Sequence, residues 1–345
     1  MGKLSEKIKR IVVDNPIVIL LFVIVGVLVG FVPSFLTWGN FVGVMKQVAP
    51  TLVVAMGVTI VFISNAKDLS AATNMAFAAV ISNLVMMHVG GALGVTLGIG
   101  AAILVGLLFG TLNGILVAWL DINPFIATLV SSLVFEGIGL VITDAQTLNF
   151  MPKGLLKLNR TYFAGIPVMF LFAVVLYIIG TYALKKSSFG RRLFAVGTSR
   201  KAAFLSGVSP VLYKMIAYWI CGVCASIGGV MLSIRLNAAS QGMTKTVMLD
   251  IISAVLIGGS SMSGGKGSLI GTAFGVIVLG FLSNGLNLLN VDYNVLNIIK
   301  GGIILIAVVM DAMKERASDY RLIRQTKLQN EKLMPKSSAD VAAKS

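Results

Sequence analysis

The sequence has few charged residues: Asp, Glu, Lys and Arg together make up 12% of its 345 residues, against about a quarter in soluble domains. It contains one histidine, His88, which excludes a histidine-rich metal site. Its two cysteines, Cys221 and Cys224, stand in one apolar run without a second pair, so we expect buried thiols that pack as small hydrophobic groups. The catalytic motifs G-x-S-x-G and H-E-x-x-H are also missing. The composition predicts a protein that performs no chemistry of its own.

Apolar residues are abundant instead. They make up 57% of the chain, and the mean hydropathy is +0.94, whereas soluble domains are roughly 45–50% apolar. A helix of about 20 apolar residues crosses a bilayer. We therefore predict an all-α, polytopic integral membrane protein with about ten spans. These spans lie near residues 17–37, 48–66, 69–89, 92–119, 125–143, 166–184, 212–233, 247–259, 268–289 and 295–313.

The basic residues gather in three segments, residues 1–16, 185–214 and 314–345. Lys and Arg are retained on the cytoplasmic side of membrane proteins, and an even number of predicted spans separates each segment from the next. We therefore expect all three on the cytoplasmic side of a transmembrane domain that covers residues 17–313. The net charge of +15 lies between apolar spans and not on one folded face, so nucleic acid is not an expected partner.

A short internal repeat links the two halves of the chain. Both copies end an apolar, glycine-rich span and lead into the next one, and five predicted spans separate them. An odd number of spans between the copies implies inverted topology, which is common in transporters. The first copy is Asn113-Gly114, Asp121 and Asn123, and the second, 171 positions later, is Asn284-Gly285, Asp292 and Asn294.

The glycine-rich segment Gly259–Ser268 invites comparison with a phosphate-binding loop. The pattern G-x-x-x-x-G-K-[ST] fails, because Gly267 follows Lys266 and Ser260 stands where the first glycine is required. The segment also joins two apolar runs, with no strand before it. We interpret it as a flexible cytoplasmic turn, and we expect that this chain does not hydrolyse ATP.

Polar residues inside the spans are candidates for a solute pathway. Charge in the bilayer is costly and usually faces a cavity or a partner, and among the ionisable residues only Glu136 lies deep in a span. Asparagines suit a neutral, hydroxyl-rich solute, although they also join helices to one another. The candidate pathway residues are Asn113, Glu136, Asn284 and Asn287. The other ionisable residues are expected near span ends with their charged groups reaching toward water: Lys67, Asp68, Arg235, Asp250 and Lys300.

Four segments resemble one known family, the permease subunits of bacterial ABC importers for simple sugars, of the ribose type. Asp68-Leu69-Ser70 is similar to that family's GGIDLS, and residues 123–129, NPFIATL, to its PFIATL segment. GTSRKAAFLSG, residues 197–207, resembles the family's GGNEEAARLSG. Residues 249–271, together with the NGLN sequence at 284–287, resemble its C-terminal signature. The likeness extends from about Lys46 to Asp311.

The resemblance implies a mechanism and a set of partners. Two permeases, identical or homologous, would form a pore in the bacterial inner membrane, with membrane lipid around it and a solute-binding protein outside. A separate cytoplasmic subunit would bind ATP and magnesium, so this chain itself would bind no cofactor. Residues 197–207 would transmit closure of the ATPase. The residues assigned to this coupling are Gly197, Arg200, Lys201, Ala202, Ala203, Ser206 and Gly207.

Two departures from the family pattern affect these assignments. Arg200 and Lys201 replace an acidic pair, so an ion pair with the ATPase cannot be carried over with the same sign. Glu136 stands where relatives often have arginine. We expect an importer of a monosaccharide or similar small polar solute. The alternatives are a nucleoside or branched-chain amino-acid importer of the same superfamily, an ion-coupled secondary transporter, and a membrane anchor that transports nothing.

Overall fold

The computed structural model describes residues 26, 30, 35–292, 294–302, 305 and 309. The predicted N-terminal segment 1–16, the tail 314–345, most of the first predicted span and about half of the last one lie outside the described residues. The chain divides into two units, residues 1–301 and 302–345. The description below concerns the first unit.

Seven helices in the described part of the chain are long and apolar enough to cross a membrane, which confirms the prediction of an all-α polytopic protein. Six agree with predicted spans to within a few residues, and α3 begins ten residues before the predicted start at 48. The long helices are α3 (Trp38–Ile63), α4 (Ala71–Val89), α5 (Gly91–Gly114, continued by the π-helical turn η1, Ile115–Trp119), α6 (Pro124–Ile142), α8 (Val168–Lys186), α11 (Pro210–Leu236) and α13 (Leu269–Leu288).

Shorter elements connect these helices. Helix α12 corresponds to the predicted span 247–259, but its 11 residues extend only about 16 Å, roughly half of a bilayer core. The strands β1 and β2 form a two-residue hairpin. The short elements are α7 (Lys153–Arg160), β1 (Tyr162–Phe163), β2 (Ile166–Pro167), α9 (Ser188–Thr198), α10 (Arg200–Leu205), η2 (Gln241–Thr244) and α12 (Val247–Ile257).

The central segment 185–214, one of the three basic segments expected on the cytoplasmic side, is mostly helical. Serine hydroxyls start its helices: Ser187 accepts from the backbone of Gly190 at the start of α9, and Ser199 from that of Ala202 at the start of α10. Ser209 caps α11 in the same way, one residue before Pro210. Side-chain caps of this kind satisfy the free N–H groups of a first turn. Hydropathy does not detect such short, capped helices in a charged stretch.

Helices α3, α4, α5 and α11 pack closely around small residues. Gly106 on α5 and Gly222 on α11 face each other, and a Cβ on either would collide with the backbone of the other. Asn74 on α4 donates to the carbonyl of Gly222 at 3.0 Å and accepts from Ser226 at 3.2 Å. Small residues and side-chain amides at helix contacts are typical of membrane proteins. Cys221 and Cys224 are both buried and unpaired here, as expected.

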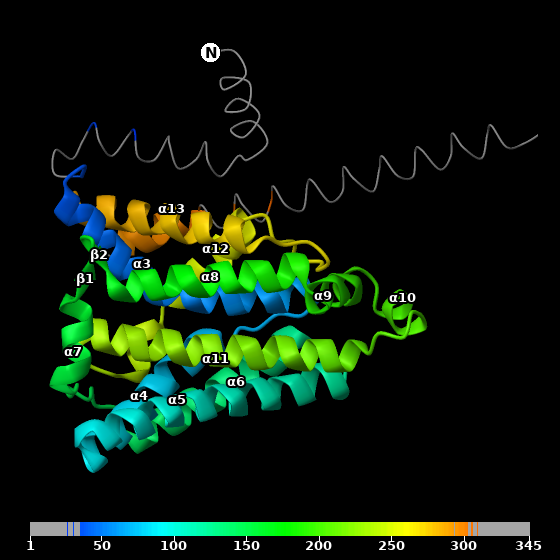
Figure 1. Cartoon of the computed structure of the whole chain (residues 1–345), viewed down its shortest axis with the longest axis horizontal. Helices are drawn as coiled ribbons and strands as arrows, with labels where there is room; N and C mark the ends of the chain where they lie inside the picture. Colours follow the sequence, from blue (N-terminus) through cyan, green and yellow to red (C-terminus); the bar gives the residue numbers. More distant parts are fainter. Residues whose placement is uncertain are drawn as a thin grey trace, which may run out of the picture. The chain divides into compact units, whose positions relative to one another are not determined.

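The bundle has two ends, which we name after their elements. Figure 1 shows α9 and α10 together at one end, the α10 end, and α7, β1 and β2 at the other, the hairpin end. Helix α5 runs toward the α10 end, whereas α13 runs away from it. The two repeat copies therefore have opposite directions, as the inverted repeat predicts. Each copy also caps the helix that follows it. The side-chain oxygen of Asn123 accepts from the backbone N–H of Phe125, and that of Asp292 accepts from the N–H of Asn294.

Candidate coupling surface and solute pathway

Helix α10 is a six-residue helix that stands at the edge of the bundle. The methyl group of Ala203 is its buried side chain, 3% exposed, and the carbonyl of Ala203 accepts from Val208 N at 3.0 Å. Gly207 ends the helix with a φ of +77°, a conformation that suits glycine. Ala203 and Gly207 therefore determine the shape of the α10 turn, and both lie in the segment predicted to couple to an ATPase.

The outer face of α10 is apolar and basic at the same time. Phe204 is 69% exposed and Leu205 is 77% exposed, although both are large hydrophobic side chains. Arg200 and Lys201, one turn earlier, are exposed as well. An exposed apolar patch with a polar rim is characteristic of a protein interaction site. The face offers a partner two hydrophobic side chains beside a positive charge.

Arg200 is held within this chain. Its guanidinium forms an ion pair with Asp121, which lies between η1 and α6. The two side chains are 48% and 65% exposed, and an exposed ion pair contributes roughly 0–1 kcal/mol. In this structure the guanidinium therefore points back toward its own chain. Of the two basic residues in the predicted coupling motif, Lys201 is the one without an ion-pair partner among the described residues.

Three segments that are distant in sequence meet behind α10. The amide of Gly265, in the glycine-rich segment, donates to the carbonyl of Ile63 at 3.0 Å. A Cβ on Gly264 would lie 2.6 Å from Cα of Asn65, and one on Gly197 would collide with the carbonyl oxygen of Ile63. The glycines therefore allow the end of α3, the end of α9 and the glycine-rich segment to pack backbone against backbone. A displacement of α9 would therefore reach the end of α3 and the glycine-rich segment after α12 directly.

The segment between α3 and α4 leads into a buried polar network. The carboxylate of Asp68 accepts from the amide and hydroxyl of Ser70, at 2.8 and 2.6 Å. Ser70 Oγ accepts from the Asn113 amide at 2.7 Å, and Asn113 Oδ1 accepts from Ser131 at 2.7 Å. Asp68 is 3% exposed, and this burial raises the pKa of its carboxyl while the bonds from Ser70 oppose the shift.

This network joins α5 and α6 to the turn before α4. Asn113 is completely buried and uses both its donor and its acceptor there. Its position is that of a helix–helix contact, the second role that the sequence allowed for it. A place for Asn113 on the solute pathway stays a prediction.

Three phenylalanines separate this network from a second polar region. Phe135 on α6 packs against Phe77 on α4 and Phe109 on α5, with ring centroids 5.4 and 3.9 Å apart. Glu136 follows directly and is partly buried. Among the described residues its carboxylate has no hydrogen-bond or ion-pair partner, although it stands in the middle of α6.

The side chain of Gln241 lies one helical turn beyond Glu136. It is 5% exposed, and neither its amide nitrogen nor its oxygen has a partner within the described part of the chain. Its amide lies directly against Gly139 of α6, where any Cβ would overlap it. The surrounding segment 237–246 is not α-helical, and irregular backbone at membrane depth usually lines a cavity. Glu136 on α6 and Gln241 on the adjoining turn η2 thus form a second polar region, whose side chains have no partners among the described residues.

Sequence analysis missed Gln241. The segment between α11 and α12 carries no motif, and a glutamine between apolar runs is an ordinary loop residue. One signal was present: the predicted span 247–259 is too short to cross a bilayer, so the chain before it must enter the membrane in another form.

The remaining predicted residues are dispersed. Asn284 on α13 is partly buried, and its Oδ1 has no partner among the described residues, while Asn287 is exposed. Lys300 binds Asp250 on α12 at 2.9 Å, with 11% and 26% of their side chains exposed. These two charges neutralise each other. The sequence had suggested that each would reach separately toward water, and the structure corrects that expectation.

Comparison with known proteins agrees with the fold. Residues 40–308 match the family described as "Branched-chain amino acid transport system / permease component". The ribose import permease protein of Bacillus subtilis is 36% identical over 297 residues, which are 85% of this chain and 91% of that protein. The Escherichia coli K12 ribose permease is 32% identical, covering 89% and 96%, and the D-allose permease of the same organism is 30% identical, covering 85% and 90%. No solved structure matches the chain.

Proposed function

The chain belongs to the permease family of the branched-chain amino acid transport type, and we propose that it imports a monosaccharide, driven by ATP that a separate subunit hydrolyses. The relatives named for ribose and D-allose support a sugar as the solute. In this proposal two permeases share the pore, an extracytoplasmic binding protein delivers the sugar, and the α10 end faces the cytoplasm.

One observation carries the proposal: the exposed apolar and basic helix α10 directly follows α9, and the end of α9 packs backbone against backbone on the end of α3 and on the glycine-rich segment before α13. Phe204 and Leu205 would insert into a cleft of the ATPase. Closure of the ATPase would displace α10 and α9, and the glycine contacts would pass the movement to the end of α3 and to the glycine-rich segment after α12. The closed ATPase would bind one state of the permease, inward-open or outward-open, more tightly than the other. The difference in binding free energy would then favour that state.

Glu136 and Gln241 are the groups that we assign to sugar recognition. A sugar offers hydroxyl groups that donate and accept, and these two side chains offer a carboxylate and an amide that have no partners in the part of the chain that the structure describes. The Asn113 network is already saturated and would hold α5 and α6 in place around them.

The test uses the permease in proteoliposomes, with ATPase subunits encoded beside it and radiolabelled ribose as the probe. Phe204→Ala with Leu205→Ala should abolish ATP-dependent uptake and co-purification of the ATPase, because the variant removes the two side chains proposed to insert into the ATPase. Both side chains are solvent-exposed, so their loss should leave the fold of the permease intact. Ala203→Asp and Gly207→Arg are less informative, since Ala203 is buried and Gly207 has a positive φ.

The matched control is Leu158→Ala with Phe163→Ala, which removes two exposed hydrophobic residues at the hairpin end. It should leave the ATPase bound. Uptake that continues without ATP and stops when an ion gradient is dissipated would contradict the proposal and favour an ion-coupled transporter.

A further inference from the structure

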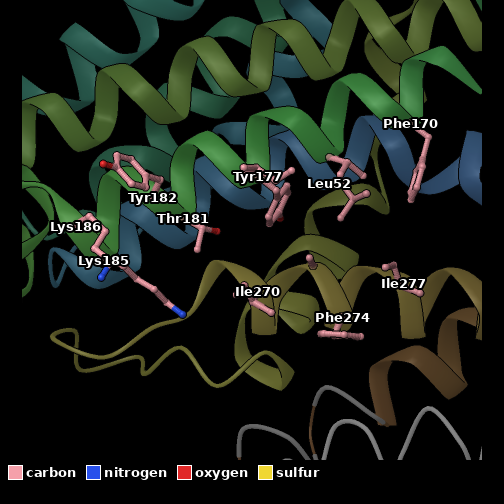
Figure 2. A pocket seen from close by; sticks show the side chains of 13 residues that line it. Leu52, Phe170, Tyr177, Thr181, Tyr182, Lys185, Lys186, Ile270, Phe274 and Ile277 are labelled. Atoms are coloured by element: carbon pink, nitrogen blue, oxygen red, sulfur yellow. The ribbon is translucent and has the colours of Figure 1, made fainter.

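An apolar groove runs along the side of the bundle between α3, α8 and α13. It has a volume of about 460 Å³. Phe170, Val174 and Ile178 of α8 form one wall, and Ile270, Phe274 and Ile277 of α13 form the other. Figure 2 shows Phe170 and Ile277 toward one end of the groove and Lys185 and Lys186 at the other. The groove therefore runs from an apolar end to a basic end, parallel to the spanning helices.

The basic end lies at the last turn of α8. Lys185 and Lys186 line the groove, both are exposed, and neither has an ion-pair partner within the described residues. Arg191, at the start of α9, adds a third positive charge, because its guanidinium donates to the carbonyl of Lys186 at 3.4 Å. Basic pockets between transmembrane helices bind the head groups of anionic lipids.

A phospholipid with a negative head group matches both ends of the groove. Its phosphate suits the basic end at Lys185 and Lys186, and an acyl chain suits the apolar walls that α8 and α13 provide. We propose that this groove binds an anionic phospholipid, with its phosphate on Lys185 and Lys186 and an acyl chain between α8 and α13.

The bound lipid would lie beside the coupling elements. Ser187, which follows the two lysines, caps α9, and α9 leads into α10. A phosphate on the lysines would therefore hold the α8–α9 junction at a fixed depth in the membrane.

The experiment measures phosphatidylglycerol that remains bound to the purified full-length chain in nanodiscs made of equal parts phosphatidylglycerol and phosphatidylcholine. Each lysine near a membrane surface contributes an affinity factor of about five toward anionic lipid. We expect Lys185→Gln with Lys186→Gln to weaken retention roughly 5- to 30-fold. Ala273→Trp, which fills the groove and leaves the charges, should abolish it. Lys153→Gln with Lys157→Gln makes the same charge change on α7 and should have no effect.

A photoreactive benzophenone residue in place of Ile178, which is 64% exposed, identifies what lies over the groove. A cross-link to phosphatidylglycerol that is lost in the Ala273→Trp variant supports the proposal. A cross-link to residues 17–34 of the same chain would overturn it, because the first predicted span would then cover the groove. Equal retention of phosphatidylcholine and phosphatidylglycerol would overturn it as well.

Discussion

Two neighbouring parts of α6 treat buried polar groups in opposite ways. Toward the α10 end, Ser131 closes a chain of hydrogen bonds through Asn113 and Ser70 to Asp68. Toward the hairpin end, Glu136 and Gln241 have no partners within the described residues. An unsatisfied buried polar group costs about 1–3 kcal/mol, so the buried amide of Gln241 lowers the stability of the fold unless something else supplies its hydrogen bonds. The first region holds helices together, and the second is suited to a passing solute.

The largest effect should come from the saturated region. Asn113→Leu removes two buried hydrogen bonds, the one that Asn113 donates to Ser70 and the one that it accepts from Ser131, while both serine hydroxyls keep an acceptor in Asp68 and the Thr128 carbonyl. We expect a loss of about 2–4 kcal/mol of folding stability. Thermal unfolding of the purified protein in detergent measures it. Asn287→Leu, at an exposed position on α13, is the control and should unfold close to the wild-type temperature.

An Asn113→Leu protein that unfolds normally but no longer transports would reverse the comparison. Asn113 would then belong to the pathway, as the sequence first suggested, and the network would be incidental to stability.

Gln241→Leu should change folding stability in the opposite direction from Asn113→Leu and by a smaller amount. It removes two unsatisfied polar atoms and fills the space with an apolar side chain of similar size, so stability should rise by about 1 kcal/mol. Uptake should nevertheless weaken by roughly fivefold, the equivalent of one neutral hydrogen bond to the sugar. The same thermal assay and ribose uptake in proteoliposomes give the two numbers.

Met243→Leu, in the same irregular segment, is the matched control and should change neither number. A Gln241→Leu protein with unchanged uptake would remove Gln241 from the pathway. A destabilised one would show that its amide has a partner in the folded membrane protein.

The sequence was sufficient to predict the membrane-spanning helices. It was insufficient to predict which of their polar side chains have hydrogen-bond partners. Apolar runs predict spans because transfer of about 20 residues into lipid outweighs local detail, and so α4, α6 and α13 begin and end close to the predicted residues. Hydropathy contains no information on which helix faces meet. Asn113 and Glu136 therefore looked equivalent, although one is saturated and the other is not.

The same limit explains the two largest surprises. Helices α9 and α10 depend on serine caps and on backbone contacts at Gly197 and Gly265, which no periodicity records. The sequence does not indicate Gln241, because its side chain packs against Gly139, a contact between positions about 100 residues apart. Resemblance supplied the coupling segment, but the pairing of Arg200 with Asp121 inside the chain required the structure.

The smallest expected effect is the pH dependence that arises from Asp68. Burial raises the pKa of its carboxyl in the folded protein above its unfolded value, and the bonds from Ser70 compensate only in part. Between the two pKa values the folded protein holds a proton that the unfolded chain has lost. Stability from this group therefore falls as pH rises through that window, and it is regained on acidification.

Asp68→Asn isolates this contribution, because the amide cannot ionise. The difference in unfolding temperature between wild type and variant should move in favour of the wild type as pH is lowered from 8 toward the raised pKa. A difference that stays constant would show that Asp68 is neutral or solvated at all these pH values. A difference that moves toward the variant would mean that the bonds from Ser70 outweigh burial. The saturated region would then stabilise a full negative charge, and its contrast with Glu136 would lie in the number of hydrogen bonds alone.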